Sequence, residues 1–139
     1  MTRPIEILLV EDSRGDALLT KDGLADARIA NAVHHAWTGK EALDLLFNQK
    51  YLLDFVLLDL NLPDMAGIDI LAKIKNNESH CHIPVVVMTT SSHETDRMRS
   101  YNLQAAGYIT KPLDPDEFIR VIKGISTYWF QLVSLPHKS

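Results

Sequence analysis

The segment FVLLDLNLP, residues 55–63, decides the fold that this sequence predicts. Its first four residues are apolar without alternation, a pattern typical of a strand that is buried on both faces of a parallel sheet. The apolar run ends at Asp59. Because ligands bind outside the carboxyl ends of the strands in open α/β sheets, Asp59 is the first candidate functional residue.

Similar apolar runs occur elsewhere in the chain, and polar residues follow each of them. They cover residues 5–10, 85–88 and 107–110, and the residues that follow are Glu11-Asp12, Thr89 and Lys111, respectively. A weaker run at 32–36 contains His34 and His35, which an edge strand tolerates. These runs predict five strands in all.

Helix signals lie between the runs. Capping patterns mark the start of three helices: Thr38 with Glu41, Ser91 with Glu94, and Asp114 before Pro115. Two further helices are expected from about 15 to 27 and over 68–74. The order is βα repeated five times, which predicts an α/β fold with a doubly wound, five-stranded parallel sheet, a (βα)5 three-layer sandwich.

Composition excludes several classes of protein. The 139 residues suit one domain, and 46% hydrophobic residues are enough for a core. A formal charge of −4 argues against a nucleic-acid partner. No apolar run approaches the roughly 18 residues that span a bilayer, and the first run is too short for a signal peptide. We therefore expect a cytoplasmic protein without a membrane partner.

The carboxyl ends of the strands bring together a set of residues with related chemistry. Glu11, Asp12 and Asp59 would converge there, and three carboxylates at close range need a cation. A set of oxygen ligands that leaves coordination positions open favours Mg²⁺, and the backbone carbonyl of Asn61 could supply another ligand. The sequence therefore predicts a magnesium site.

The same residues suit phosphoryl transfer, in which positioning and charge neutralisation do most of the work. Asp59 would be the nucleophile that forms an aspartyl-phosphate. Lys111 would place a positive charge on the phosphoryl oxygens, and Thr89 would donate a hydrogen bond to one of them. Asp59 is thus the predicted phosphoacceptor, and Thr89 and Lys111 are the predicted phosphoryl-binding residues.

The combined pattern resembles the receiver domains of two-component response regulators, the CheY-like family with a flavodoxin-like fold. The matching residues are Glu11-Asp12, Asp59 with the LNLP segment after it, Gly67, Thr89, Tyr108 and Lys111-Pro112. The resemblance implies a receiver domain over residues 5–125 whose Asp59 takes a phosphoryl group from a sensor histidine kinase, with Mg²⁺ or Mn²⁺ as cofactor. It implies that Thr89 and Tyr108 act as the switch. It also implies a phosphoacceptor with only its own phosphorylation and dephosphorylation chemistry, not an enzyme that turns over a separate substrate.

Two departures from that family's pattern affect local structure. Thr90 stands where alanine is usual, beside the phosphorylation site, and could narrow access to it. Gln104 stands where glycine is frequent, so the helix before the last strand is expected to lack its usual left-handed C-cap residue.

The C-terminal extension, residues 126–139, continues an apolar stripe that begins in the last helix. The tail is similar to that of single-domain regulators paired with bacterial phytochromes, which implies a phytochrome-type kinase as partner and a homodimer. The stripe either folds back on the domain or forms a dimer or partner surface. The residues expected in such a surface are Phe118, Ile122, Trp129, Phe130, Leu132 and Val133.

Other functions fit the residues less well. A phosphatase with an aspartate nucleophile needs a second acid two residues later, where this chain has Asn61. In a flavodoxin-like electron carrier, the loop after the first strand must bind a phosphate, which Glu11-Asp12 would repel. A receiver fold that serves as an unphosphorylated interaction module would not need the whole set of acidic and basic residues. His80-Cys81-His82 is interpreted as a solvated loop, not as a zinc site.

Overall fold

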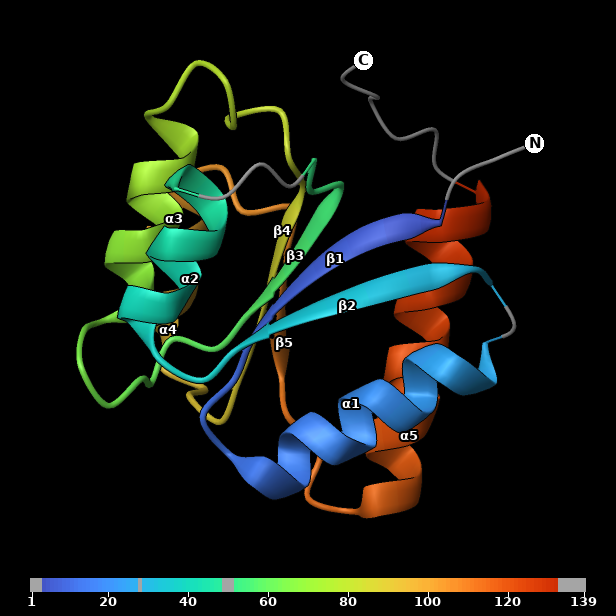
Figure 1. The fold of residues 1–139 in the computed structure, drawn as a ribbon. Coiled ribbons are helices and arrows are strands. Elements are labelled where there is room, and N and C mark those ends of the chain that lie inside the picture. Colours follow the sequence, from blue (N-terminus) through green and yellow to red (C-terminus); the bar gives the residue numbers. More distant parts are fainter. Residues whose placement is uncertain (1–3, 28, 49–51, 133–139) are drawn as a thin grey trace.

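In the described part of the chain, residues 4–27, 29–48 and 52–132 of a computed structural model, five parallel strands form one sheet (Figure 1). The strands are β1 (Ile5–Val10), β2 (Asn31–Ala36), β3 (Phe55–Leu58), β4 (Val85–Thr89) and β5 (Gly107–Thr110). Their order is β2-β1-β3-β4-β5, which places β3 at the centre and β2 at an edge. The predicted doubly wound fold is confirmed.

Helices cover both faces of this sheet (Figure 1). They are α1 (Arg14–Asp26), α2 (Gly39–Phe47), α3 (Gly67–Lys75), α4 (Glu94–Asn102) and α5 (Pro115–Ser126), which continues into a π-helical segment, η1 (Thr127–Leu132). Helices α1 and α5 lie side by side on one face, and α2 and α3 lie on the other. None of the helices in the described ranges is long and apolar enough to cross a membrane.

The sheet divides the apolar interior into two cores because alternate strand side chains point to opposite faces. In β3, Val56 and Leu58 pack toward α2 and α3, whereas Phe55 and Leu57 pack toward α1 and α5. All four side chains are buried, which explains why this strand reads as a continuous apolar run. Burial on both faces therefore fixes the central strand, at whose end Asp59 lies.

Two of the three predicted helix caps are present. The Thr38 hydroxyl accepts a hydrogen bond of 3.1 Å from the Glu41 N–H, and the Asp114 carboxylate accepts one of 2.9 Å from the Glu117 N–H. The third prediction is wrong, because α4 begins at Glu94 without a side-chain cap. The Ser91 hydroxyl instead donates to the Asp96 carboxylate, so Ser91 belongs to the loop before α4.

The expectation for Gln104 is also wrong. Its φ is 68°, so Gln104 itself takes the left-handed conformation that ends α4. Its N–H donates to the Tyr101 carbonyl, and the Ala105 N–H donates to the Ser100 carbonyl. These bonds satisfy carbonyls at the helix end and offset the strain of a side chain at positive φ.

The apolar stripe of α5 and η1 packs on the domain itself. Phe118 and Ile122 are 2% and 0% exposed, so the expectation that they form a partner surface is wrong. The half-buried rings of Trp129 and Phe130 lie 5.5 and 5.2 Å from the ring of Phe55, measured between centroids. The side chain of Leu132 and all of Val133 lie outside the described residues.

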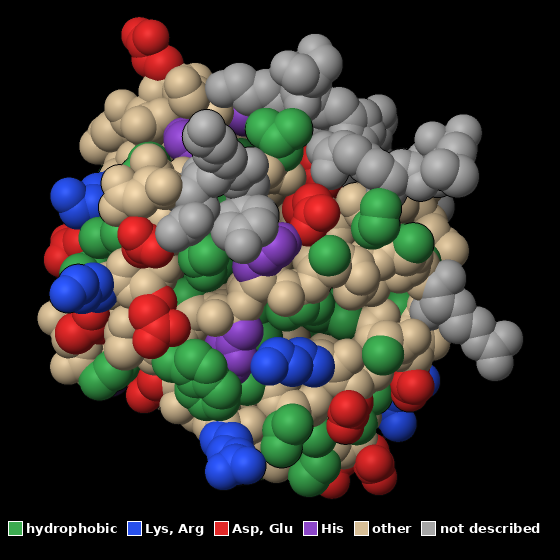
Figure 2. Space-filling model, in the orientation of Figure 1, with side chains coloured by type: hydrophobic (Ala, Val, Ile, Leu, Met, Phe, Trp, Pro, Cys, Tyr) green, Lys and Arg blue, Asp and Glu red, His purple; other side chains and the backbone are tan. Residues whose placement is uncertain are grey.

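The surface carries charges of both signs. Figure 2 shows acidic and basic side chains interspersed with hydrophobic ones on the described part of the face that carries β2, α1 and α2. Mixed charge of this kind is typical of a solvated surface. The polar residues with distinctive chemistry gather instead at one edge of the sheet.

Candidate functional site

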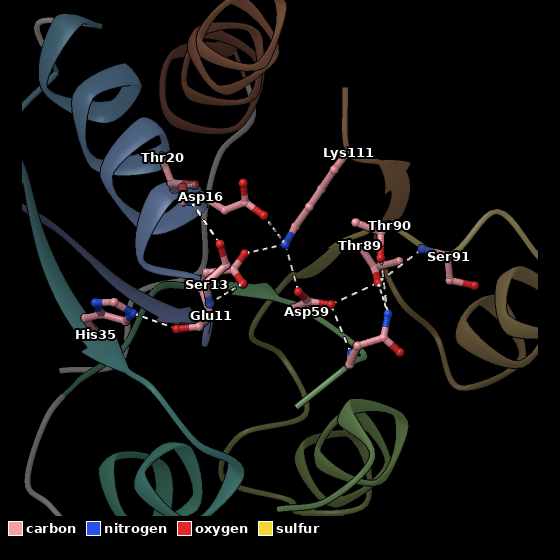
Figure 3. Close-up of polar contacts among 11 residues, drawn as sticks. Glu11, Ser13, Asp16, Thr20, His35, Asp59, Thr89, Thr90, Ser91 and Lys111 are labelled. Atoms are coloured by element: carbon pink, nitrogen blue, oxygen red, sulfur yellow. Dashed lines mark hydrogen bonds and ion pairs between the residues drawn. The ribbon is translucent and has the colours of Figure 1, made fainter. Parts of the chain in front are cut away.

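The carboxyl ends of β1, β3, β4 and β5 bring the predicted residues together (Figure 3). Glu11 follows β1, Asp59 follows β3, Thr89 ends β4, and Lys111 follows β5. The strands are parallel and hydrogen-bonded neighbours, so residues up to 100 positions apart meet at one edge. Glu11, Asp59, Thr89 and Lys111 are all buried, whereas Asp12 is exposed at the mouth of the site.

Lys111 is the centre of the charge network. Its Nζ lies 2.6 Å from Glu11 Oε1, 2.8 Å from Asp59 Oδ2 and 2.9 Å from Asp16 Oδ2. Burial alone would lower the pKa of Lys111, but its hydrogen bonds to the three carboxylates outweigh burial and raise that pKa above its usual value. Lys111 therefore carries a fixed positive charge beside Asp59.

Sequence reasoning missed Asp16. It lies in the first turn of α1, five residues after Glu11, and its carboxylate points toward Lys111 (Figure 3). An acidic residue in the first turn of the helix that follows an acidic strand end is a weak signal, because acidic residues are common there for capping reasons alone. Only the position of Lys111 in space reveals the contact.

Both oxygens of the Asp59 carboxylate are held by donors. Oδ1 accepts hydrogen bonds from the Thr89 hydroxyl at 2.9 Å and from the Asn61 N–H at 3.0 Å, and Oδ2 accepts one from Lys111 at 2.8 Å. Donors that are already aimed at an anion are the feature that stabilises added negative charge. The donors around Asp59 are therefore placed to stabilise added negative charge on its carboxylate.

Asn61 and Thr90 lie at the mouth of the site. The Asn61 side-chain amide donates to the Thr89 hydroxyl at 3.3 Å and to the Thr90 hydroxyl at 3.4 Å. Both Asn61 and Thr90 are exposed, so the two residues border the opening above Asp59. The proposed metal contact of Asn61, through its backbone carbonyl, stays a prediction.

The acidic cluster fits a divalent cation. One carboxylate oxygen each from Glu11, Asp12 and Asp59 lies within 4.8 Å of the others. Burial raises the pKa of Glu11 to about 7; Lys111 opposes this effect and Asp59 adds to it. A cation beside Glu11 would add to the stabilisation that Lys111 gives its ionised form. An all-oxygen set with one exposed member suits Mg²⁺ or Mn²⁺.

The histidines and the cysteine of 80–82 do not form a metal site in the structure. His80 hydrogen-bonds Asn77 and the carbonyl of Leu46, and its ring packs edge-on against Phe47. Cys81 is exposed. Among the described residues, the metal-compatible cluster is that of Glu11, Asp12 and Asp59.

Tyr108 connects β5 to the loop that follows Thr89. Its hydroxyl donates to the Ser91 carbonyl at 2.9 Å, and the guanidinium carbon of Arg97 lies 5.3 Å from its ring centroid. Tyr108 is half-buried, so its ring is held between the sheet and α4. Tyr108 therefore contacts both the loop that follows Thr89 and helix α4.

This fold and this site together define a receiver domain. Residues 7–123 match the response regulator receiver domain family, and the chain belongs to that family. The protein is thus a phosphorelay signalling module, as its family is, and the recognition of a CheY-like receiver is confirmed.

The more specific resemblance is to regulators from phytochrome systems. The chain is 36% identical to the response regulator Rcp1 of Synechocystis, over 96% of this chain and 94% of that protein. The phosphorylated cyanobacterial phytochrome response regulator RcpA superposes with a TM-score of 0.91 and 36% identity, over 96% of this chain and 99% of that one. The Mn²⁺-bound form of Rcp1 gives a TM-score of 0.91 and 37% identity over the same shares.

Proposed function

We propose that Asp59 accepts a phosphoryl group from a phosphohistidine of a sensor kinase. The observation that supports this most directly is the environment of the Asp59 carboxylate. It belongs to the acidic cluster and is held by the Lys111 ammonium, the Thr89 hydroxyl and the Asn61 N–H. The three donors and the neighbouring carboxylates support the assignment of Asp59 as the phosphoacceptor.

The transfer is a displacement at phosphorus. A carboxylate oxygen of Asp59 attacks the phosphorus of the phosphohistidine, a P–O bond forms, and the P–N bond to the donor imidazole breaks. The electron pair of that bond goes to the imidazole nitrogen, which takes a proton from water. Lys111 and Thr89 then bind phosphoryl oxygens, because both already donate to the carboxylate that carries the group.

Glu11, Asp12 and Asp59 would hold Mg²⁺, with the Asn61 carbonyl as a further ligand. When bound, the cation neutralises charge on the phosphoryl oxygens during transfer. Mn²⁺ can replace it, as the Mn²⁺-bound structure of Rcp1 supports. A phosphoryl oxygen on Asp59 would compete for the Thr89 hydroxyl, and the contact between Tyr108 and Ser91 would carry that change to α4.

The upstream partner we propose is a phytochrome-type histidine kinase. Likeness to RcpA and to the bacteriophytochrome response regulator AtBRR, at 36% identity each, supports this choice. We also propose a cytoplasmic location and a homodimer. Because Phe118 and Ile122 are buried, the dimer would use exposed residues such as Met98 and Tyr101 of α4. A monomer mass by light scattering, both with and without phosphorylation, would refute the proposed homodimer.

Intact mass spectrometry tests the phosphoacceptor. The protein is incubated with Mg²⁺ and acetyl phosphate, beside an Asp59→Asn control and a sample with EDTA. We expect the mass of one phosphoryl group on the wild type alone. If the wild type gains none, from acetyl phosphate or from a phosphorylated phytochrome kinase, the chain is an unphosphorylated interaction module. Turnover of a phosphomonoester would instead indicate a phosphatase.

A further inference from the structure

Residues 60–66, which follow Asp59 in the loop between β3 and α3, are folded tightly on themselves. Asn61 and Ala66 form an antiparallel bridge, and the Gly67 N–H donates to the Leu60 carbonyl at 2.9 Å. A Cβ on Gly67 would lie 2.3 Å from the Asp59 carbonyl oxygen, so only glycine lets the loop close here. The bridge and the hydrogen bond tie Asn61 to the end of the loop near α3.

Asp64 attaches this loop to the start of α2. Its Oδ1 accepts a 2.8 Å hydrogen bond from the Gly39 N–H, and its Oδ2 accepts one of 2.9 Å from the Lys40 N–H. The absence of a side chain at Gly39 permits this approach, because a Cβ there would lie 2.3 Å from Met65 Cγ. Two bonds from one carboxylate fix its orientation as well as its position.

We propose that Asp64 is a positioning residue, which fixes residues 60–66 to the N-terminus of α2 and thereby holds Asn61 in place beside Asp59. The proposal rests on the proposed function, because it assigns Asn61 a role at the phosphoacceptor. The Asn61 N–H donates to Asp59 at 3.0 Å, and its carbonyl is the expected further ligand of the cation.

The chemistry of a helix start favours this attachment. The first N–H groups of a helix have no partner within the helix, and the helix dipole favours a negative charge there. The backbone hydrogen bonds from Gly39 and Lys40 lower the pKa of Asp64, which keeps its carboxylate ionised. These are therefore charge-assisted bonds, which are stronger than neutral ones.

The capping of α2 makes it possible to distinguish two roles of Asp64: stabilising the start of α2 and positioning residues 60–66. Thr38 caps the Glu41 N–H, one residue beyond the two N–H groups that Asp64 binds. Thr38→Ala therefore weakens the start of the same helix and leaves the attachment of the loop intact. If Asp64 only stabilised α2, the two substitutions would have the same effect on Asn61.

The experiment compares Asp64→Ala, Asp64→Asn and Thr38→Ala with the wild type by two measurements. Amide hydrogen exchange, resolved by NMR in the metal-free protein, reports the Asn61 N–H. The EPR signal of free Mn²⁺ reports the affinity for the cation. In Asp64→Ala we expect faster exchange at Asn61 and about tenfold weaker Mn²⁺ binding, the effect of losing a residue that orients a ligand.

Asp64→Asn keeps one acceptor oxygen, so its Asn61 exchange and Mn²⁺ affinity should lie between those of the wild type and Asp64→Ala. If Asp64→Ala does not fold, Asp64→Asn replaces it in the experiment. Thr38→Ala should leave both Asn61 exchange and Mn²⁺ affinity unchanged. Unchanged values in Asp64→Ala would overturn the proposal, and so would equal losses in Thr38→Ala. If the wild type takes no phosphoryl group but Asp64→Ala still loses Mn²⁺ affinity, the assignment of Asp59 as phosphoacceptor is overturned. The positioning role of Asp64 then stands.

Discussion

Replacing Lys111 with methionine removes one charge from the network and keeps most of the apolar stem. The ammonium lies within 2.9 Å of three carboxylates, and those of Glu11 and Asp59 are nearly inaccessible to water. At an effective dielectric constant of about 20, each contact is a gross attraction of about 6 kcal/mol, which desolvation largely offsets. Removing one partner of a buried pair costs about 3–5 kcal/mol, because the other charge is left uncompensated.

We expect the lower end of this range, about 3 kcal/mol, because Glu11 can take up a proton. The pKa of Glu11 in the folded protein, about 7, already exceeds its usual value of 4.5. A carboxyl whose pKa is raised by folding makes the folded state less stable as the pH rises from 4.5 through that pKa. Loss of Lys111 raises this pKa further, so the stability difference between Lys111→Met and the wild type should widen with pH.

Urea unfolding followed by circular dichroism measures the effect. With a slope of about 2 kcal/mol per molar urea, a loss of about 3 kcal/mol lowers the midpoint by about 1.5 M in EDTA at about pH 8. Saturating Mg²⁺ should narrow the difference, because the cation replaces the lost positive charge. An unchanged midpoint in EDTA, or a difference that Mg²⁺ widens, would refute the charge balance described for this site.

Three further predictions concern stability. Burial lowers the pKa of His35, whose buried Nδ1 has no hydrogen-bond partner among the described residues. The unfolded chain therefore binds the proton more readily, and the stability of the protein falls as the pH drops below 6.5. In urea unfolding, His35→Leu should lose less stability on acidification than the wild type, by up to about 1.4 kcal/mol per pH unit. Gly67→Ala places a Cβ 2.3 Å from the Asp59 carbonyl oxygen and should cost about 2–3 kcal/mol by thermal unfolding. Gly124→Ala is the control: it lies in α5 with nothing within 4 Å, so it should leave stability unchanged or raise it slightly. Trp129→Ala should destabilise the protein by about 2 kcal/mol in urea through its packing on Phe55, and an unchanged midpoint would mean that Trp129 serves only a partner.

Much of the site follows from the sequence because it lies at the ends of recognisable strands. A run such as 55–58, apolar at every position, specifies a strand buried on both faces, and the residue after it must lie at the edge of the sheet. Parallel pairing then brings Asp59, Thr89 and Lys111 to the same edge. Strand order and strand direction are therefore sufficient to predict that these three residues converge.

Local patterns were less reliable at the two ends of α4. Ser91 has the spacing of a capping residue, but its hydroxyl finds Asp96, and α4 begins without that cap. Gln104 lacks the freedom of glycine, yet backbone hydrogen bonds at the end of α4 hold it at positive φ. In both places the outcome depends on hydrogen bonds that the spacing of residues does not encode.

The sequence by itself determined the strands, most helix starts and the acidic and basic residues at the strand ends, because these depend on contacts close along the chain and on the direction of parallel strands. The tertiary structure alone decided the contacts made by side chains on different elements. Asp16 reaches Lys111 across 95 residues, Asp64 reaches the start of α2 across 25, and Trp129 packs on Phe55. Each of these depends on how whole helices and loops seat against the sheet, and no periodicity in the chain records that arrangement.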